Sequence, residues 1–216
     1  VLNYLGTYFP RSYAEAYCIF SNFYTKDILS WLFRDKVSIF DFGCGTGGEI
    51  IGLLSAMVNL LPNIQWVEIT ALDGNHNALR IFEDIIKVCS THVDVNVAYR
   101  IIPTVIDDFY DLSLLDSILT NDFDIIISCK SICEFVTKER FEKQNPYEHI
   151  VKTFLPKLEP LGAMILVDVT TYNNVSQEWL PLMMDSGLSK TGCKVIMKNR
   201  GYNQTFTVSH SRQEKD

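Results

Sequence analysis

The sequence predicts an α/β fold: a doubly wound, mostly parallel sheet of seven strands that ends in a C-terminal antiparallel hairpin. Three observations support this prediction. From residue 37 onward, short β-branched runs alternate with segments of helical periodicity. The first of these runs breaks into a glycine-rich turn. Two strand-like runs near the end are separated by only the short stretch 199–203, which forces antiparallel pairing.

The chain of 216 residues is long enough to bury a core without metal or disulfide support. In residues 1–36, Tyr13, Tyr17, Phe20 and Tyr24 recur at helical spacing, and we expect a helical lid or packing segment there. Residues 37–216 show no linker or internal repeat and are predicted to form a single Rossmann-like, cofactor-binding unit.

After residue 36 the predicted elements alternate between strand and helix. Turn-forming residues such as proline, glycine, asparagine and aspartate separate them. The strands are expected at 37–42, 64–72, within 95–106, and at 123–128, 163–169, 193–198 and 204–209; the helices at about 47–61, after residue 74, at 146–158 and at 177–184. Asn145 and Pro146 form an N-cap and first helical position, and Glu148 is placed to complete a capping box.

Composition excludes several classes of protein. A formal charge of -7 argues against a broad, nonspecific nucleic-acid surface. No apolar run reaches the roughly 18 residues of a membrane span, so no membrane partner is expected. The six cysteines are scattered, which favours reduced thiols in a cytoplasmic protein and gives no metal site. Oligomeric state is left open.

The glycine turn itself fits two patterns. Gly43-x-Gly45-x-x-Gly48 satisfies the dinucleotide fingerprint, and Gly43-x-Gly45-x-Gly47 suits another adenosine cofactor equally well. Asp41 favours the second pattern, because a carboxylate two residues before the turn repels a pyrophosphate and matches a cationic amino group. The antiparallel hairpin predicted at the C-terminus points the same way.

With Asp41-Phe42-Gly43-Cys44-Gly45-Thr46-Gly47 and the final hairpin in view, the chain resembles the class I S-adenosylmethionine-dependent methyltransferases over residues 37–210. The resemblance implies a Rossmann-like methyltransferase fold with S-adenosyl-L-methionine over the carboxyl ends of the first strands. It implies that Asp41 orients the methionine amino group, that Asp73 binds the ribose, and that Asp107 or Asp108 meets the adenine with Phe109 against the ring. The full cofactor set is Asp41, Gly43, Cys44, Gly45, Thr46, Gly47, Asp73, Gly74, Asp107, Asp108, Phe109 and Ser128.

The methyl acceptor is expected just beyond the fourth strand, at residues 128–135. The Asn/Asp-Pro-Pro-Tyr/Phe motif of many enzymes that methylate exocyclic amines of bases is absent there. Glu134 is the first candidate for a polar or basic catalytic role, and Lys130 and Ser131 follow. Alternatively, Lys130 and Glu134 form an ion pair on one helix face.

A weaker resemblance links Arg11-Ser12-Tyr13-Ala14, residues 131–135 and residues 208–212 to the ribosome-associated branch of this family. The cysteine ligands of that branch's metal cluster are missing. The predicted function is therefore methyl transfer from S-adenosylmethionine to an unidentified acceptor, RNA or a small molecule. The alternatives are a catalytically silent, RNA- or ribosome-associated module that binds the cofactor, and, less favoured, an NAD-dependent oxidoreductase.

Overall fold

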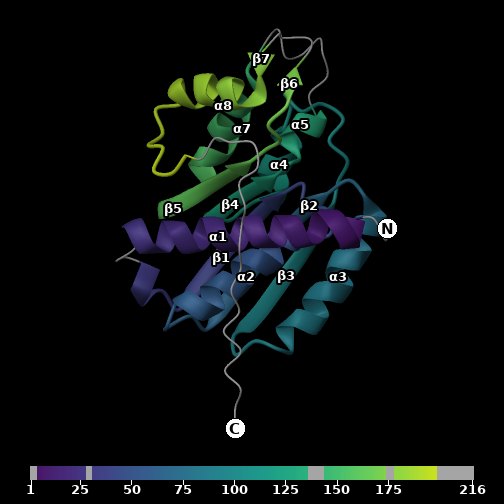
Figure 1. Cartoon of the computed structure of the whole chain (residues 1–216). Helices are drawn as coiled ribbons and strands as arrows, with labels where there is room; N and C mark the ends of the chain where they lie inside the picture. Colours follow the sequence, from purple (N-terminus) through teal and green to yellow (C-terminus); the bar gives the residue numbers. More distant parts are fainter. Residues whose placement is uncertain (1–3, 28–30, 136–143, 174–177, 199–216) are drawn as a thin grey trace.

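The computed structural model describes residues 4–27, 31–135, 144–173 and 178–198. Its centre is a sheet of five parallel strands in the order β3-β2-β1-β4-β5 (Figure 1). The strands are β1 (Lys36–Phe42), β2 (Trp66–Asp73), β3 (Asn96–Pro103), β4 (Phe123–Cys129) and β5 (Leu158–Val167). The strand β1 lies in the middle, with β2 and β3 on one side and β4 and β5 on the other. This doubly wound order matches a Rossmann-like fold.

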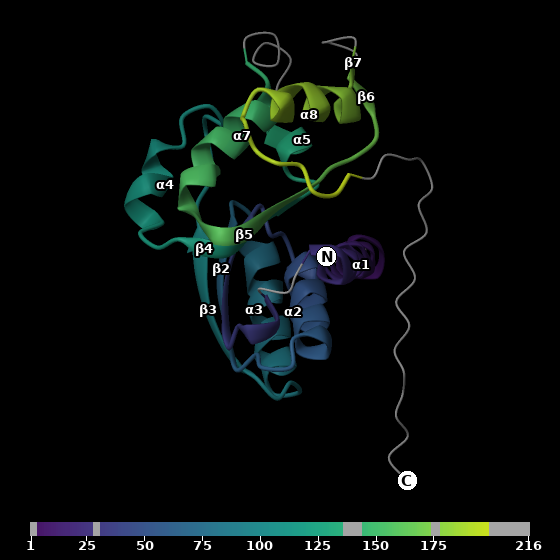
Figure 2. The ribbon, with the colours of Figure 1, turned by 90° about the vertical axis from the view of Figure 1, so that its left-hand side faces the viewer.

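Two helical layers cover the sheet (Figure 2). One layer holds α1 (Phe9–Asp27), α2 (Gly48–Leu60) and α3 (His76–Ser90); the other holds α4 (Ser113–Ile118), α5 (Ile132–Phe135), α7 (Pro146–Phe154) and α8 (Leu180–Ser189). Short turns are a π-helical turn at Tyr4–Tyr8 and 3-10 turns at Trp31–Phe33 and Leu155–Lys157. The chain thus has the layered α/β architecture that its alternating pattern predicts.

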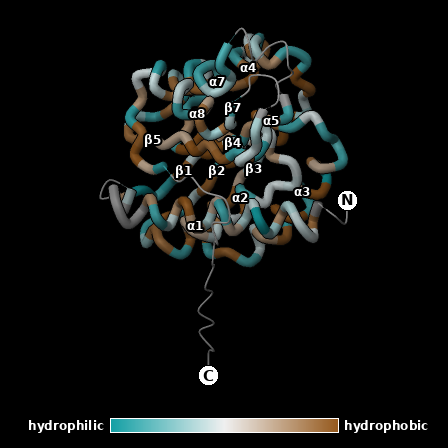
Figure 3. Tube along the Cα trace, turned by 45° about the horizontal axis from the view of Figure 1, so that its top comes forward, coloured by the Kyte–Doolittle hydropathy of each residue, from teal (hydrophilic) through white to brown (hydrophobic). Residues whose placement is uncertain are grey.

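Burial explains why the strands form a parallel sheet. Every residue of β4 is buried, as expected for a strand covered on both faces. In β1, Val37 and Ile39 enter the core beneath α1 to α3, whereas Phe40 and Phe42 enter the core beneath α7 and α8. Hydrophobic stretches accordingly gather along the central strands (Figure 3). The side chain of Asp41 therefore points toward the layer that contains α1 and α2.

The N-terminal helix α1 packs closely on α2. A Cβ added to Gly48 would lie 2.6 Å from the carbonyl oxygen of Phe9, and one added to Gly52 would lie 2.3 Å from that of Tyr13. The two glycines are four residues apart, so one face of α2 presents bare backbone to α1. Gly48, which completes the dinucleotide fingerprint in the sequence, has a packing role here.

Local capping follows the sequence in part. The side chain of Asn145 accepts hydrogen bonds from the backbone N–H groups of Tyr147 and Glu148 at 3.0 and 3.2 Å, which confirms the predicted N-cap of α7. Glu148 does not complete a capping box; its carboxylate pairs instead with Lys152 at 2.6 Å, one helical turn further along. Asn75 caps α3 in the same way as Asn145 caps α7.

The seven-stranded sheet and its C-terminal hairpin are not confirmed. Residues 193–198 form no strand, and the second predicted arm, 204–209, lies outside the described residues. Val195 and Ile196 are 49% and 41% exposed, so this apolar run has no buried face. Such a run forms a strand only where a partner strand and a buried face are present. An unpredicted antiparallel pair, β6 (Tyr172–Asn173) with β7 (Glu178–Trp179), precedes α8, which begins at Leu180 and not at residue 177.

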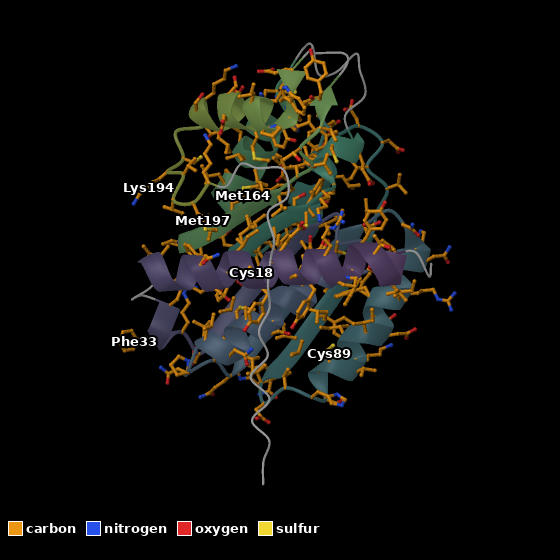
Figure 4. The ribbon with its side chains drawn as sticks, viewed as in Figure 1. Cys18, Phe33, Cys89, Met164, Lys194 and Met197 are labelled. Atoms are coloured by element: carbon orange, nitrogen blue, oxygen red, sulfur yellow. The ribbon has the colours of Figure 1, made fainter. Side chains whose placement is uncertain are left out.

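The six cysteines are free thiols. Cys18 on α1 and Cys89 on α3 lie well apart (Figure 4). Among the described residues, no group of three or more histidine, cysteine or acidic side chains is arranged to hold a metal ion. Within the same part of the chain, no helix combines the length and apolarity that crossing a membrane requires.

Candidate cofactor site

The glycine loop joins β1 to α2 at the carboxyl end of the sheet. The backbone N–H groups of Gly43 and Cys44 donate to the carbonyl oxygen of Leu72 at 2.8 and 3.0 Å, and the N–H of Gly47 donates to that of Cys44 at 2.7 Å. Gly43, Gly45 and Gly47 all have positive φ angles, of 81°, 50° and 78°. The loop is therefore held against β2 in a conformation that favours glycine.

The three glycines face different surroundings. A Cβ on Gly43 would lie 2.4 Å from Cβ of Ser131, and one on Gly47 would lie 2.1 Å from the ring of Phe82. A Cβ on Gly45 would meet nothing within 4 Å. Gly43 and Gly47 thus allow the loop to pack on the protein, whereas Gly45 forms its open side, where a ligand can approach the backbone.

Asp41 lies in β1, two residues before the glycine loop. It is fully buried in β1, opposite Ala71 of β2 and Ile127 of β4. Both of its carboxylate oxygens lack a hydrogen-bond partner among the described residues. Burial raises the pKa of Asp41 well above its usual range, and the charges of Glu49 and Asp73 raise it further. An ionised carboxylate that is buried without a partner is energetically unfavourable, so a bound cation or a proton would stabilise Asp41.

Glu49, in the first turn of α2, adds a second buried carboxylate that sequence reasoning missed. Its side chain is only 4% exposed, and burial raises its pKa to about 8, although a backbone hydrogen bond and the charge of Lys130 act in the opposite direction. The signal in the sequence was an acid directly after the glycine turn, where the N-terminus of a helix favours negative charge.

Asp73 ends β2, as predicted, and holds the glycine loop in place. Its Oδ2 accepts a hydrogen bond from the N–H of Gly45 at 2.7 Å, and its Oδ1 accepts one from the N–H of Asn75, also at 2.7 Å. Each carboxylate oxygen has a second lone pair for a further donor. Gly74 follows, and a Cβ there would lie 3.4 Å from Val105 in the segment after β3.

The predicted adenine contacts occupy different environments. Asp107 and Asp108 are exposed, and Oδ1 of Asp108 accepts a hydrogen bond from the N–H of Tyr110 at 2.9 Å, so Asp108 stabilises its own turn. Phe109 is a core residue, only 2% exposed and packed edge-on against Phe42. Its ring is therefore not placed for stacking on a ligand, because the apolar side chain is used in the core.

The segment after β4 is anchored beneath the glycine loop. The hydroxyl oxygens of Ser128 and Ser131 lie 2.5 Å apart, and they lie 3.0 and 2.9 Å from the carbonyl oxygen of Phe42. One hydroxyl donates to the other, which donates to this carbonyl oxygen, because each hydroxyl has a single proton. Both serines are buried. The structure therefore brings Ser131 close to the site but engages its hydroxyl in fixing the end of β1.

Lys130 has a positive φ of 59°, and its ammonium group forms an ion pair with Glu15 of α1. The helix-face pair with Glu134 considered from the sequence is therefore wrong. An interaction across 115 residues of chain depends on where α1 packs and leaves no mark in local spacing. Lys130 links the N-terminal helix to the segment that follows β4.

Glu134 sits at the outer edge of this region. Partial burial raises its pKa, and the charges of Asp73 and Asp168 raise it further. Asp168 directly follows β5 and accepts a hydrogen bond from the hydroxyl of Tyr147 at 2.8 Å. Sequence reasoning missed Asp168, although an acid at the end of a strand is the same signal that identified Asp41 and Asp73.

Two surface cavities lie away from the glycine loop. One, of about 200 Å³, is lined by β2, β3 and residues 120–123, and the other lies between α4 and α7. Neither is lined by Asp41 or by a residue of the glycine loop. The candidate site is therefore defined by buried polar groups and backbone geometry.

Comparison with known proteins gives structural similarity only. No family model matches the sequence, and no curated protein matches it. The chain is similar in structure to coclaurine N-methyltransferase bound to N-methylheliamine and SAH, with 14% identity, 69% of this chain and 35% of that chain covered, and a TM-score of 0.38. It is also similar to the glycopeptide N-methyltransferase MtfA complexed with S-adenosyl-L-methionine, with 15% identity, 72% and 53% covered, and a TM-score of 0.44.

A third similar structure is PKMT2 from Rickettsia typhi in complex with AdoHcy, with 18% identity, 71% and 24% covered, and a TM-score of 0.42. The chain spans at most 53% of the length of these three proteins. The comparisons give no support to the ribosome-associated branch. The solved structures that this chain resembles are S-adenosylmethionine-dependent methyltransferases, at low sequence identity.

Proposed function

We propose that this protein binds S-adenosyl-L-methionine and transfers its methyl group to an acceptor that is RNA or a small molecule. The observation that carries the proposal is Asp41, fully buried beside the glycine loop with both carboxylate oxygens unpartnered among the described residues. A buried carboxylate without a partner suits the ammonium group of the methionine moiety, because a charge-assisted hydrogen bond compensates for its burial.

The same charges argue against a dinucleotide cofactor. Asp41, Glu49 and Asp73 interact electrostatically with one another at the carboxyl ends of β1 and β2. A pyrophosphate placed there meets three acids, whereas the nearby cation, Lys130, is already paired with Glu15. An NAD-dependent oxidoreductase is therefore the less favoured reading.

The proposed cofactor contacts follow from these positions. Asp41 binds the ammonium group, Gly45 leaves backbone open to the ligand, and Asp73 offers its remaining lone pairs to the ribose hydroxyls. Cys44 and Thr46 contribute backbone to the loop, and Asp107 or Asp108 meets the adenine amino group. Ser128 supports the loop from below through the carbonyl oxygen of Phe42.

S-adenosylmethionine supplies a methyl group on a sulfonium, which an acceptor nucleophile displaces in line. The protein's task is to align the acceptor and exclude water. We assign Glu134 the role of accepting a proton from the acceptor, since partial burial and the charges of Asp73 and Asp168 raise its pKa and make it a stronger base than an ordinary surface carboxylate. Lys130 and Ser131 remain candidates in the acceptor segment, and both also make the structural contacts described above.

A second candidate function is a catalytically silent module that binds the cofactor, acting on RNA or at the ribosome. One observation favours it: two of the three predicted catalytic side chains, Lys130 and Ser131, are engaged in structural interactions. The two functions differ in whether binding leads to transfer.

Methyl-labelled S-adenosylmethionine tests both. Equilibrium dialysis of the labelled cofactor with wild-type protein, Asp41→Asn and the exposed control Asp84→Asn measures binding. We expect Asp41→Asn to weaken it by roughly 10-fold or more and Asp84→Asn to leave it unchanged. Incubation with a cell extract separated into RNA, protein and small molecules then measures transfer. Binding without label in any fraction supports the silent module, and absence of binding contradicts both functions.

A further inference from the structure

Among the described residues, the side chains gathered around the glycine loop carry more acidic groups than cations to neutralise them. Asp41 and Glu49 are 0% and 4% exposed. Asp73 lies beside both, and its two carboxylate oxygens accept only neutral backbone N–H groups in the described structure. The cation that acts on Glu49 is Lys130, and its ammonium group is paired with another acid, Glu15. The site therefore has an excess of negative charge that burial makes costly.

Two buried carboxylates that repel each other do not both stay ionised without a cation between them. Burial is the main cause that raises the pKa of Asp41 and of Glu49, and the charge of Glu49 is the next cause for Asp41. Asp41 has no described donor to either oxygen. In the protein without a ligand, a proton on one of these carboxyl groups removes the unfavourable charge.

We propose that Asp41 and Glu49 together retain one proton in the ligand-free protein, and that an ammonium group binding against Asp41 drives this proton into solvent. This inference rests on the proposed function, because the ammonium group is that of S-adenosylmethionine. The step breaks one carboxyl O–H bond and passes its proton to the buffer, and the incoming ammonium charge replaces the proton's charge. Glu49 is then the positioning residue that sets how cofactor binding depends on pH.

The groups that surround this pair fix the direction of the effect. Glu49 comes from α2, Asp73 from the end of β2, Lys130 from the segment after β4 and Glu15 from α1. The thiols of Cys44 and Cys129 are also close, but burial raises their pKa values well above the ordinary one, so they stay neutral. As long as the pair holds its proton, the affinity for the cofactor should therefore rise with pH, by up to about 10-fold per pH unit for one released proton.

Isothermal titration calorimetry with S-adenosylmethionine tests this inference. The binding enthalpy of the full chain is measured at pH 6.5 in phosphate and in an amine buffer such as imidazole, which differ in ionisation enthalpy. The difference gives the number of protons released. We expect about one proton for wild-type protein and a clearly smaller number for Glu49→Gln, because the variant lacks one of the two carboxyl groups that share the proton and one of the charges that raise the pKa of Asp41. The control Glu83→Gln, on α3, should match wild type.

The outcomes separate the inference from the function on which it rests. If the cofactor binds and the enthalpy is the same in both buffers, the shared proton is contradicted and the proposed function stands. If Glu49→Gln releases as many protons as wild type, the role of Glu49 is contradicted. If no binding heat appears and equilibrium dialysis also shows no binding, the proposed function itself is overturned.

Discussion

The carboxylate of Asp73 accepts a hydrogen bond of 2.7 Å from the backbone N–H of Gly45, so the acid that ends β2 holds the glycine loop that follows β1. This contact ties together two sequence features that lie 28 residues apart. It gives Asp73 a structural role as well as its proposed role at the ribose.

Replacement of Asp73 tests both of these roles. Asp73→Ala removes the acceptor for Gly45 and Asn75, and should reduce the free energy of unfolding by about 1–3 kcal/mol and the affinity for S-adenosylmethionine by roughly 10-fold or more. Asp73→Asn keeps one side-chain oxygen and should lose less stability. Urea denaturation and calorimetry measure the two effects. Unchanged binding in Asp73→Ala would remove the ribose assignment.

Gly45 and Gly192 form a matched pair for testing where the ligand approaches. Both have positive φ, of 50° and 73°, and a Cβ on either meets nothing within 4 Å. Alanine at either position should reduce the free energy of unfolding by about 1–2 kcal/mol, because a residue with a Cβ is strained in this left-handed backbone conformation. Only Gly45→Ala should also weaken cofactor binding. Equal binding by the two variants would show that the ligand does not approach the loop at Gly45.

Gly52 tests the packing of α1 on α2. In an exposed helix, Gly→Ala stabilises by about 1 kcal/mol. Here the new Cβ would lie 2.3 Å from the carbonyl oxygen of Tyr13, so we expect Gly52→Ala to lower the melting temperature, the opposite sign. A melting temperature above that of wild type would mean that α1 does not pack on α2 as described.

The raised pKa of Glu49 should make the stability of the ligand-free protein depend on pH. Its folded pKa of about 8 lies above the unfolded value near 4.5, so the native state holds the extra proton. The stability that this proton contributes is fully present below pH 4.5 and is lost as the pH rises through about 8. Relative to wild type, Glu49→Gln should lose less stability over this range in urea denaturation. Parallel curves for the two proteins would contradict the buried, protonated state of Glu49.

Local patterns predicted the parts of the fold that local physics determines. The fully buried run of β4, the cap at Asn145 and the strand-end acids Asp41 and Asp73 follow from hydrophobicity, capping and spacing, and the structure confirms their places. The roles of Gly48 and Lys130 depend on where α1 packs, which is a tertiary contact. Phe109 was assigned to a ligand because a pattern does not distinguish an aromatic ring in the core from one at a site.

The central claim is that the glycine loop binds S-adenosylmethionine and not a dinucleotide, and thermal unfolding with S-adenosylmethionine, S-adenosylhomocysteine or NAD tests it most directly. A ligand at 100 times its Kd stabilises the native state by about 2.7 kcal/mol. For a chain of this size that corresponds to a rise in Tm of roughly 5–10 °C. We predict this rise with S-adenosylmethionine or S-adenosylhomocysteine and no rise with NAD. A rise with NAD alone would contradict the account.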